Sequence, residues 1–319
     1  MVMGNRFSDL NYNELINHLS LIKNKFYIID SDFFSVASDV LRKEVISNPY
    51  WIFPTGEKNK NINVFKQCCE DLAIQGVSRH THIIAVGGGV VNDFAGFVAA
   101  SLYRGMKWSN IPTSVMAQID ASIGGKVGIN LEAGKNLVGS FHFPEMTFFC
   151  SSLLETLPKS EIANGHGELM KYAFLSKEIN DLVLSGKSKT EIYLACAKYK
   201  ESIILKDSHE KGLRKVLNLG HTLGHAFEIQ YKIPHGLAVL AGLNWILKFS
   251  PISNGEERFN QCLNILSLKS PDSYRVTEET KALVKRDKKK RSNEEIDLIV
   301  LEEIGKPVVR TYKFDDLWK

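Results

Sequence analysis

The sequence lacks several features that would place a chain in a special class. No apolar run approaches the ~20 residues of a membrane-spanning helix, and the opening residues, MVMGNRFSDLNYNELINHL, do not resemble a secretory signal. The five cysteines form no CxxC pair. An odd count without such pairs is typical of a reducing compartment rather than of a disulfide scaffold. We therefore predict a cytoplasmic protein without a membrane span.

A strong charge of one sign is also missing. The net charge of +4 is too small to indicate nucleic-acid binding, so we expect no nucleic-acid partner. The mild excess of basic residues fits a few cations gathered around a small anionic substrate. A chain of 319 residues is long enough for one large or two medium domains.

The pattern of apolar residues changes near the middle of the chain. Short apolar runs predict strands at 25–30, 50–54, 82–89, 108–112 and 146–150, with helices at 63–77 and 92–103. Such alternation predicts an α/β domain with a parallel sheet. Later periods predict helices at 161–176, 190–206, 212–230, 236–250, 256–267 and 276–286, then a β-hairpin over 296–314. We therefore predict two domains, an α/β domain at 1–157 and a mostly helical domain at 158–319.

Three glycines follow the third predicted strand in IIAVGGGVVND, residues 83–93. Glycines between a strand and a helix let the backbone approach a pyrophosphate at the helix N-terminus. The spacing is not GxGxxG, so a plain tight turn remains an alternative. Asp93, early in the next helix, is either a cap or a cofactor contact.

Two histidines lie four residues apart in NLGHTLGHAFE, residues 218–228. On one helix, His221 and His225 share a face, and together with Arg214 and Asn218 they form a polar stripe among leucines. A histidine pair in the core is the alternative, but a polar stripe on an apolar helix must be paired or ligated. We expect this stripe to line a site.

A carboxylate and another histidine extend this set. Glu168 lies in GHGELMKYAF and His235 begins the apolar segment HGLAVLAG. With His221 they provide the Glu/His/His ligand type of an open catalytic zinc site. An ion pair between Glu168 and Lys171, and a helix cap at His235, are the alternatives.

Basic residues recur in two further segments. The glycine-rich segment 118–144 carries Lys126 and Lys135, and we expect it to be a loop that wraps an anion. The run KRDKKK at 285–290 is either a solvated face or part of the same anion site.

Taken in order, these motifs resemble one known family. GGGVVND, YRGMKWSNIPTSVMAQIDASIGGKVGIN, GKNLVGSF, GELMKYA, GLRKVLNLGHTLGHAFE, HGLAVLAG and RDKKK are similar to the motifs of 3-dehydroquinate synthases and the wider sugar phosphate cyclases. The resemblance runs from about residue 25 to 310. It implies a dinucleotide-binding α/β domain that holds NAD⁺, a helical metal-binding domain, a homodimer, and a divalent metal. Zinc is the expected metal and cobalt the alternative.

The resemblance also implies a role for each matching residue. The metal ligands would be Glu168, His221 and His235. The residues around the reacting hydroxyls would be Asp120, Lys171 and Asn218. The phosphate would be held by Lys126, Asn136, His225, Lys288 (or Lys289) and, from the other subunit, Arg104. The substrate carboxylate would be held by Lys200 and Arg214. The NAD⁺ site would be lined by Asp30, Glu57, Lys60, Gly88, Gly89, Val90, Asp93, Thr113, Ser114, Lys126 and Lys135.

The implied reaction converts 3-deoxy-arabino-heptulosonate 7-phosphate to 3-dehydroquinate and phosphate, in the shikimate pathway of aromatic amino acid biosynthesis. The alternatives are another sugar phosphate cyclase, of the 2-deoxy-scyllo-inosose or 2-epi-5-epi-valiolone synthase type, a metal-dependent polyol dehydrogenase, and a non-catalytic relative. Some positions depart from the family. Leu237 replaces a frequent glutamate that would support His235, Asn92 replaces a glycine, Ser114 replaces a threonine, and His166 is an additional imidazole near Glu168.

Overall fold

The computed structural model describes residues 8–286 and 294–318. The chain divides into two compact units, Met1–Pro158 and Lys159–Lys319. No helix within the described residues has the length and apolar composition needed to cross a membrane.

The first unit is built on a four-stranded parallel sheet. Its strands are β1 (Lys25–Asp30), β2 (Tyr50–Phe53), β3 (His82–Gly87) and β4 (Trp108–Pro112), in the order β2-β1-β3-β4. These are four of the five strands that the sequence predicted. The predicted α/β class with a parallel sheet is confirmed.

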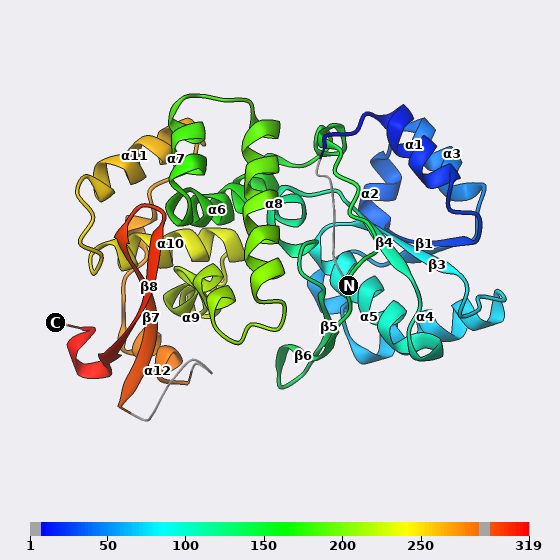
Figure 1. The fold of residues 1–319 in the computed structure, drawn as a ribbon. Helices are drawn as coiled ribbons and strands as arrows, with labels where there is room; N and C mark the ends of the chain where they lie inside the picture. Colours follow the sequence, from blue (N-terminus) through cyan, green and yellow to red (C-terminus); the bar gives the residue numbers. More distant parts are fainter. Residues whose placement is uncertain (1–7, 287–293, 319) are drawn as a thin grey trace. The chain divides into compact units, whose positions relative to one another are not determined.

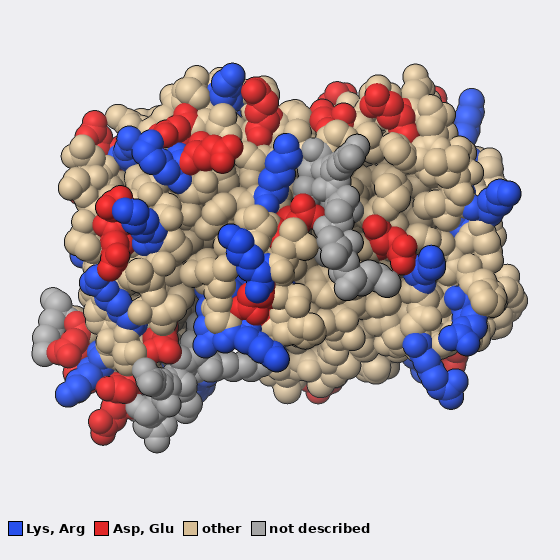
Figure 2. Space-filling model, viewed as in Figure 1, with Lys and Arg blue, Asp and Glu red and all other residues tan. Residues whose placement is uncertain are grey.

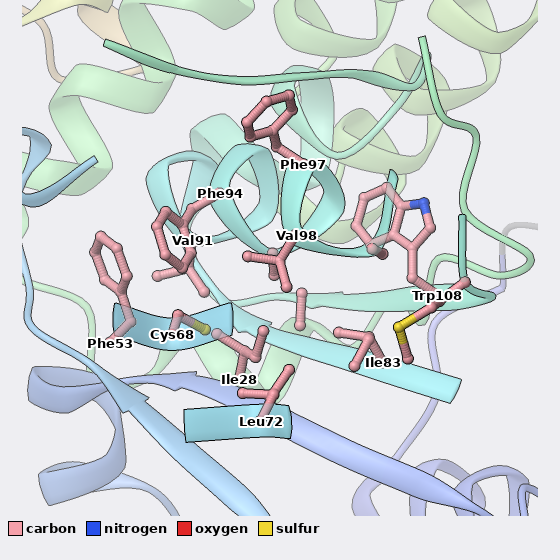
Figure 3. Packing of buried hydrophobic residues seen from close by; sticks show 14 of the residues in the cluster. Ile28, Phe53, Cys68, Leu72, Ile83, Val91, Phe94, Phe97, Val98 and Trp108 are labelled. Atoms are coloured by element: carbon pink, nitrogen blue, oxygen red, sulfur yellow. The ribbon is translucent and has the colours of Figure 1, made fainter. Parts of the chain in front are cut away.

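Helices cover both faces of this sheet (Figure 1). They are α1 (Tyr12–Ser20), α2 (Ser31–Val36), α3 (Asp39–Ile46), α4 (Ile62–Ile74) and α5 (Gly89–Ser101). Alternate residues of a strand point to opposite faces, so Ile28 packs against α4 and α5 while Ile29 packs against α1 and α3. Figure 3 shows the first of these cores, with Phe94 and Val98 of α5 directed at the sheet. The unit therefore buries apolar side chains on both faces of a single sheet.

The prediction for the last part of this unit was wrong in two places. Residues 146–150 form no strand, and only an isolated bridge joins Asn110 to Thr147. The segment predicted as an anion-wrapping loop is instead a π-helical turn, η3 (Ala117–Ala121), followed by the antiparallel hairpin β5 (Lys126–Leu131) and β6 (Gly134–Phe141). Its glycines obscured the strand pattern. The remaining short turns are η1 (Glu57–Asn59), η2 (Leu102–Arg104) and η4 (Ser151–Leu154).

The second unit is mostly helical, as predicted. Its helices are α6 (Lys159–Leu175), α7 (Lys177–Leu184), α8 (Lys189–Lys206), α9 (His221–Tyr231), α10 (His235–Leu247), α11 (Gly255–Ile265) and α12 (Glu278–Lys285). The predicted hairpin is β7 (Glu295–Glu303) and β8 (Lys306–Lys313), and the short turns are η5 (Leu213–Asn218), η6 (Pro271–Ser273) and η7 (Phe314–Asp316). The helix predicted over 212–230 is broken, because η5 ends at Asn218 and Gly220 is left-handed, with φ +78°. Arg214, Asn218, His221 and His225 therefore do not form one helical stripe.

Glycines let three helices of this unit approach each other at backbone distance. A Cβ on Gly167 of α6 would lie 2.2 Å from the carbonyl oxygen of Gly236, at the start of α10. A Cβ on Gly242 of α10 would lie 2.0 Å from the carbonyl oxygen of Gly220, just before α9. Gly220 and Gly224, which precede His221 and His225, thus leave room for α10 to pack closely. This close packing places the start of α10 beside the middle of α6.

We predict that Gly167→Ala disrupts the contact between α6 and α10, because the added methyl group meets backbone atoms that cannot rotate away. Overpacking of this kind costs about 1–3 kcal/mol of unfolding free energy. Urea unfolding measures the loss. Ser160→Ala, at an exposed position on the first turn of α6, is the control. A Gly167→Ala protein as stable as that control would contradict the packing described above.

Candidate active site

Several of the residues predicted to bind the cofactor lie at one edge of the sheet. Asp30 ends β1, Gly88 follows β3, and Thr113 and Ser114 follow β4. Parallel strands present their carboxyl ends at the same edge, and ligands of open α/β sheets bind there, where the strand order reverses. In the order β2-β1-β3-β4 that point lies between β1 and β3, next to the three glycines.

Close packing leaves no room for a side chain at two glycines, where β3 ends and where α5 begins. A Cβ on Gly87 would lie 2.7 Å from Val91 Cβ, and one on Gly89 would lie 2.9 Å from Ala121 Cβ. The N-cap of α5 is Gly88, which has no side chain that could accept from the first-turn N–H groups. The first-turn N–H groups of α5 and its dipole therefore favour an anion at this end.

A buried lysine joins three of the predicted residues. The Nζ atom of Lys60 lies 2.9 Å from Asp93 Oδ2, 3.3 Å from Glu57 Oε1 and 2.8 Å from Asn136 Oδ1. Burial lowers the pKa of Lys60, but the adjacent Asp93 and Glu57 carboxylates outweigh it, so this pKa lies above its ordinary value. Lys60 is thus a charged donor that ties α5 to β6.

The remaining predicted residues of this unit are more exposed. Lys126 and Lys135 are exposed on the β5–β6 hairpin, and Asp120 is half-buried in η3. Arg104 is exposed in η2, and both it and Tyr103 have positive φ angles, of 63° and 51°. Val90 is half-buried in the first turn of α5.

The second unit brings together the carboxylate and two of the imidazoles. Glu168, His221 and His235 each offer a ligand atom, and these atoms lie within 4.8 Å of one another. His221 Nε2 is 4.0 Å from Glu168 Oε1, and His235 Nε2 is 3.9 Å from Glu168 Oε2. The sequence pattern left this convergence open, and the packing of α6, α9 and α10 produces it.

Hydrogen bonds orient both imidazoles toward the carboxylate. His221 Nδ1 lies 3.1 Å from the carbonyl oxygen of Leu219, and His235 Nδ1 lies 2.8 Å from Glu228 Oε2. Each partner accepts, so Nδ1 carries the proton and Nε2 presents its lone pair. Glu168 is buried, and its Oε2 atom has no hydrogen-bond partner among the described residues. An orphaned carboxylate oxygen beside two imidazole lone pairs fits a divalent cation.

Glu228 is a functional candidate that the sequence argument missed. Leu237 suggested that His235 lacked support, yet a carboxylate from α9 provides it. The available signal was the glutamate three residues after His225 in GHAFE. Its contact with His235 depends on how α9 and α10 pack, which no spacing rule predicts.

Lys171 and His225 adjoin the three-ligand cluster. Lys171 is buried and donates a hydrogen bond to Glu168 Oε1. The His225 ring centroid lies 5.4 Å from that of His221 and 5.9 Å from that of His235.

His166 belongs to the core, although it is two residues from Glu168. Its Nδ1 atom lies 3.1 Å from the carbonyl oxygen of Leu266, and its Nε2 atom lies 2.7 Å from the Tyr193 hydroxyl oxygen. Burial lowers the pKa of His166 to about 4, so the imidazole is neutral near pH 7. This histidine has a structural role.

A short loop presents the residues predicted to bind the carboxylate and hydroxyls. Both oxygens of Asp207 accept backbone hydrogen bonds, at 2.8 Å from Lys211, 2.7 Å from Gly212 and 3.0 Å from Arg214. Arg214 is buried and donates to the carbonyl oxygen of Ser208 at 2.7 Å.

Two neighbours of this loop complete the predicted set. Asn218, at the end of η5, donates to Glu210 Oε1 at 3.0 Å. Lys200 is buried in α8, which packs against η5. The prediction for Lys288 falls outside the described residues.

Other features of the described residues add no second site. A cavity of about 250 Å³ lies between α9, α10 and η6, but none of the described residues that line it belongs to the predicted set. Figure 2 shows basic and acidic side chains interspersed over the visible face. All five cysteines are free.

Solved structures share this architecture. A 2-deoxy-scyllo-inosose synthase complexed with carbaglucose-6-phosphate, NAD⁺ and Co²⁺ has a TM-score of 0.81 at 24% identity, covering 98% of this chain and 94% of that one. A 2-epi-5-epi-valiolone synthase from Streptomyces hygroscopicus subsp. jinggangensis, with NAD⁺ and Zn²⁺ bound, has a TM-score of 0.84 at 19% identity, covering 100% and 97%. A probable glycerol dehydrogenase from Sinorhizobium meliloti reaches only 0.57 at 15% identity, covering 88% of each chain. The fold is that of the sugar phosphate cyclases.

Sequence comparison identifies the family within that class. Models described as 3-dehydroquinate synthase N-terminal and C-terminal match residues 50–164 and 165–290. A 3-dehydroquinate synthase from Staphylococcus epidermidis is 35% identical over 346 aligned positions, covering 99% of this chain and 97% of that protein. One from Staphylococcus carnosus is 39% identical over 269 positions, covering 79% and 75%. The chain belongs to the 3-dehydroquinate synthase family, and the predicted enzyme class, a phosphate-eliminating carbon–oxygen lyase, is confirmed.

The loop that presents Arg214 generates a pH prediction. Hydrogen bonds from the backbone N–H groups of Arg214, Lys211 and Gly212 lower the pKa of Asp207 to about 2. A depressed carboxyl pKa stabilises the fold above its unfolded value, near pH ~4, and the gain is lost as the pH falls toward 2. We expect Asp207→Asn to lower the urea midpoint at pH 7, and this difference from the unmodified chain to shrink below pH ~4. A difference that persists unchanged at the lowest pH would show that the charge of Asp207 is irrelevant.

Proposed function

We propose that this chain converts 3-deoxy-arabino-heptulosonate 7-phosphate to 3-dehydroquinate and phosphate, as a cytoplasmic homodimer in aromatic amino acid biosynthesis. A sequence identity of 35% to a 3-dehydroquinate synthase, over 99% of this chain, supports this reaction. The observation that carries it is the convergence of Glu168, His221 and His235 within 4.8 Å. A carboxylate and two oriented imidazoles are the ligands of an open catalytic metal site.

The domain at 1–157 would hold NAD⁺ at the carboxyl edge of the sheet. The pyrophosphate would meet the N-terminus of α5 at Gly88 and Gly89, where first-turn N–H groups can donate. Asp30, at the end of β1, would contact a ribose. NAD⁺ and the cation supply reversible hydride transfer and polarisation of the reacting oxygen when bound.

The domain at 158–319 would hold the cation, expected to be zinc, and the sugar acid. Glu168, His221 and His235 would be the protein ligands, and Glu228 would keep the His235 ring oriented. Lys171 would donate to an oxygen at the reacting carbons. These residues fix position and charge, which is the main protein contribution to such chemistry.

Cations of the chain would hold the two anionic ends of the substrate. Lys200 and Arg214 suit a carboxylate, and phosphates of neutral sugars have no carboxylate. This pair favours the heptulosonate over the substrates of the other cyclases. The phosphate residues would be Lys126, Asn136, His225, Lys288 and the partner subunit's Arg104. Asp120 and Asn218 would contact hydroxyl groups.

We predict that the purified protein, with NAD⁺ and zinc, releases inorganic phosphate from the heptulosonate phosphate without net NADH. Catalytic NAD⁺ is reduced and reoxidised within one turnover, so absorbance at the NADH wavelength stays flat. A malachite-green assay measures phosphate. Turnover of sedoheptulose 7-phosphate or glucose 6-phosphate instead would favour another cyclase. Net NADH formed from a polyol would favour a dehydrogenase.

A second prediction concerns the cation. Glu168→Ala should abolish stoichiometric zinc binding, and Glu228→Gln should weaken it about 10–100-fold, because orientation of a ligating histidine by a carboxylate contributes this much. Isothermal titration calorimetry measures both affinities. Glu256→Gln, at an exposed site on α11, is the control. Undiminished zinc binding by Glu168→Ala would refute the ligand assignment.

A further inference from the structure

The β5–β6 hairpin is fastened to η1 and its flanking residues by several hydrogen bonds. The backbone N–H of Asn130 donates to the carbonyl oxygen of Lys60 at 2.8 Å. Asn130 Nδ2 donates to Glu57 Oε1 at 2.7 Å, and Asn130 Oδ1 accepts from the backbone N–H of Asn136 at 2.8 Å. Asn136 itself has a left-handed φ of 54°. The backbone at Asn136 is therefore held to β5 by the side chain of Asn130, which is itself bonded to Glu57.

Lys60 fixes the side chain of Asn136 as well. Its Nζ atom lies 2.8 Å from Asn136 Oδ1, and Lys60 is only 3% exposed. An ammonium group can only donate, so the atom that it contacts must be the amide oxygen rather than the amide nitrogen. This settles which end of the amide faces inward. Asn136 is exposed, and its Nδ2 atom donates no hydrogen bond within the described residues.

The orientation has a chemical consequence. With the oxygen held by Lys60, the NH₂ group is the end of the amide that remains available to a ligand. A phosphate oxygen accepts hydrogen bonds, so only this orientation offers it a donor. The reverse orientation would present a carbonyl oxygen and repel the anion.

We propose that Lys60 is a positioning residue for phosphate recognition, acting through Asn136 by holding its amide with the NH₂ group outward. This inference rests on the proposed function, in which Asn136 contacts the substrate phosphate. It gives Lys60 a second role beside the NAD⁺ contact that family resemblance implies. Glu57 and Asp93 keep the ammonium charged and in place, so the hydrogen bond to Asn136 persists across the neutral pH range.

A double-mutant cycle tests this role. The probe is inorganic phosphate. Its inhibition constant is measured in competition with the heptulosonate phosphate, using the full-length enzyme with NAD⁺ and zinc. The NAD⁺ dissociation constant of each variant is measured separately by titration calorimetry. We expect Lys60→Met to weaken phosphate inhibition about tenfold, the effect of losing one hydrogen bond to a charged group. In an Asn136→Ala background, the same substitution should have no further effect on phosphate.

The outcomes separate this inference from the proposed function. If Asn136→Ala alone leaves phosphate inhibition unchanged, the proposed phosphate contact is wrong, and the role of Lys60 falls with it. If Asn136→Ala weakens inhibition but Lys60→Met does not, only the positioning role is overturned. Equal losses from Lys60→Met in both backgrounds would also overturn it, because Lys60 would then act without Asn136.

Two further variants guard against loss of folding. Asn136→Asp keeps an oxygen for Lys60 but replaces the outward NH₂ group by an anionic oxygen. We expect it to bind phosphate no better than Asn136→Ala, whereas unweakened binding would overturn the proposed orientation. Lys58→Met is the matched control, because Lys58 is exposed on the same turn, two residues away. It should leave both the phosphate and the NAD⁺ constants unchanged.

Discussion

The helical unit depends on contacts between helix backbones that only glycine permits. Gly167 meets Gly236, and Gly242 meets Gly220, at distances that leave no room for a Cβ atom. These contacts bring α6, α9 and α10 together, and each of the three helices contributes one member of the Glu/His/His cluster. Glycine loses more backbone conformational entropy on folding than other residues do, so these glycines lower the free energy of unfolding. In return, a buried carboxylate and two imidazoles are held in a fixed arrangement before any ligand arrives.

In the first unit, the parallel sheet positions the residues predicted to bind the cofactor. A parallel sheet presents all of its carboxyl ends at one edge, so Asp30, the glycine turn and Thr113 converge without special contacts. The β5–β6 hairpin does not belong to that sheet and needs its own attachment. Lys60 and Asn130 supply it through hydrogen bonds. One lysine, itself only 3% exposed, therefore links α5 to the β5–β6 hairpin.

Much of the fold could be predicted from the sequence, because β1 and β3 contain continuous apolar runs and the later helices have apolar residues at helical spacing. The β5–β6 hairpin could not, since its glycines hide the alternation of a strand. The break at Gly220 was missed because apolar residues continue through it, so only the left-handed backbone reveals two segments. Candidate ligands were found by residue type. Glu228 and the Lys60–Asn136 bond were missed because both are tertiary contacts.

We assign Glu168, His221 and His235 to one cation site. X-ray absorption spectroscopy of the zinc-loaded full-length protein tests it most directly. We predict two imidazole nitrogens at about 2.0–2.1 Å and oxygen ligands at about 2.0–2.2 Å, without sulfur. Sulfur scattering at about 2.3 Å, or the signal of fewer than two imidazoles, would contradict it.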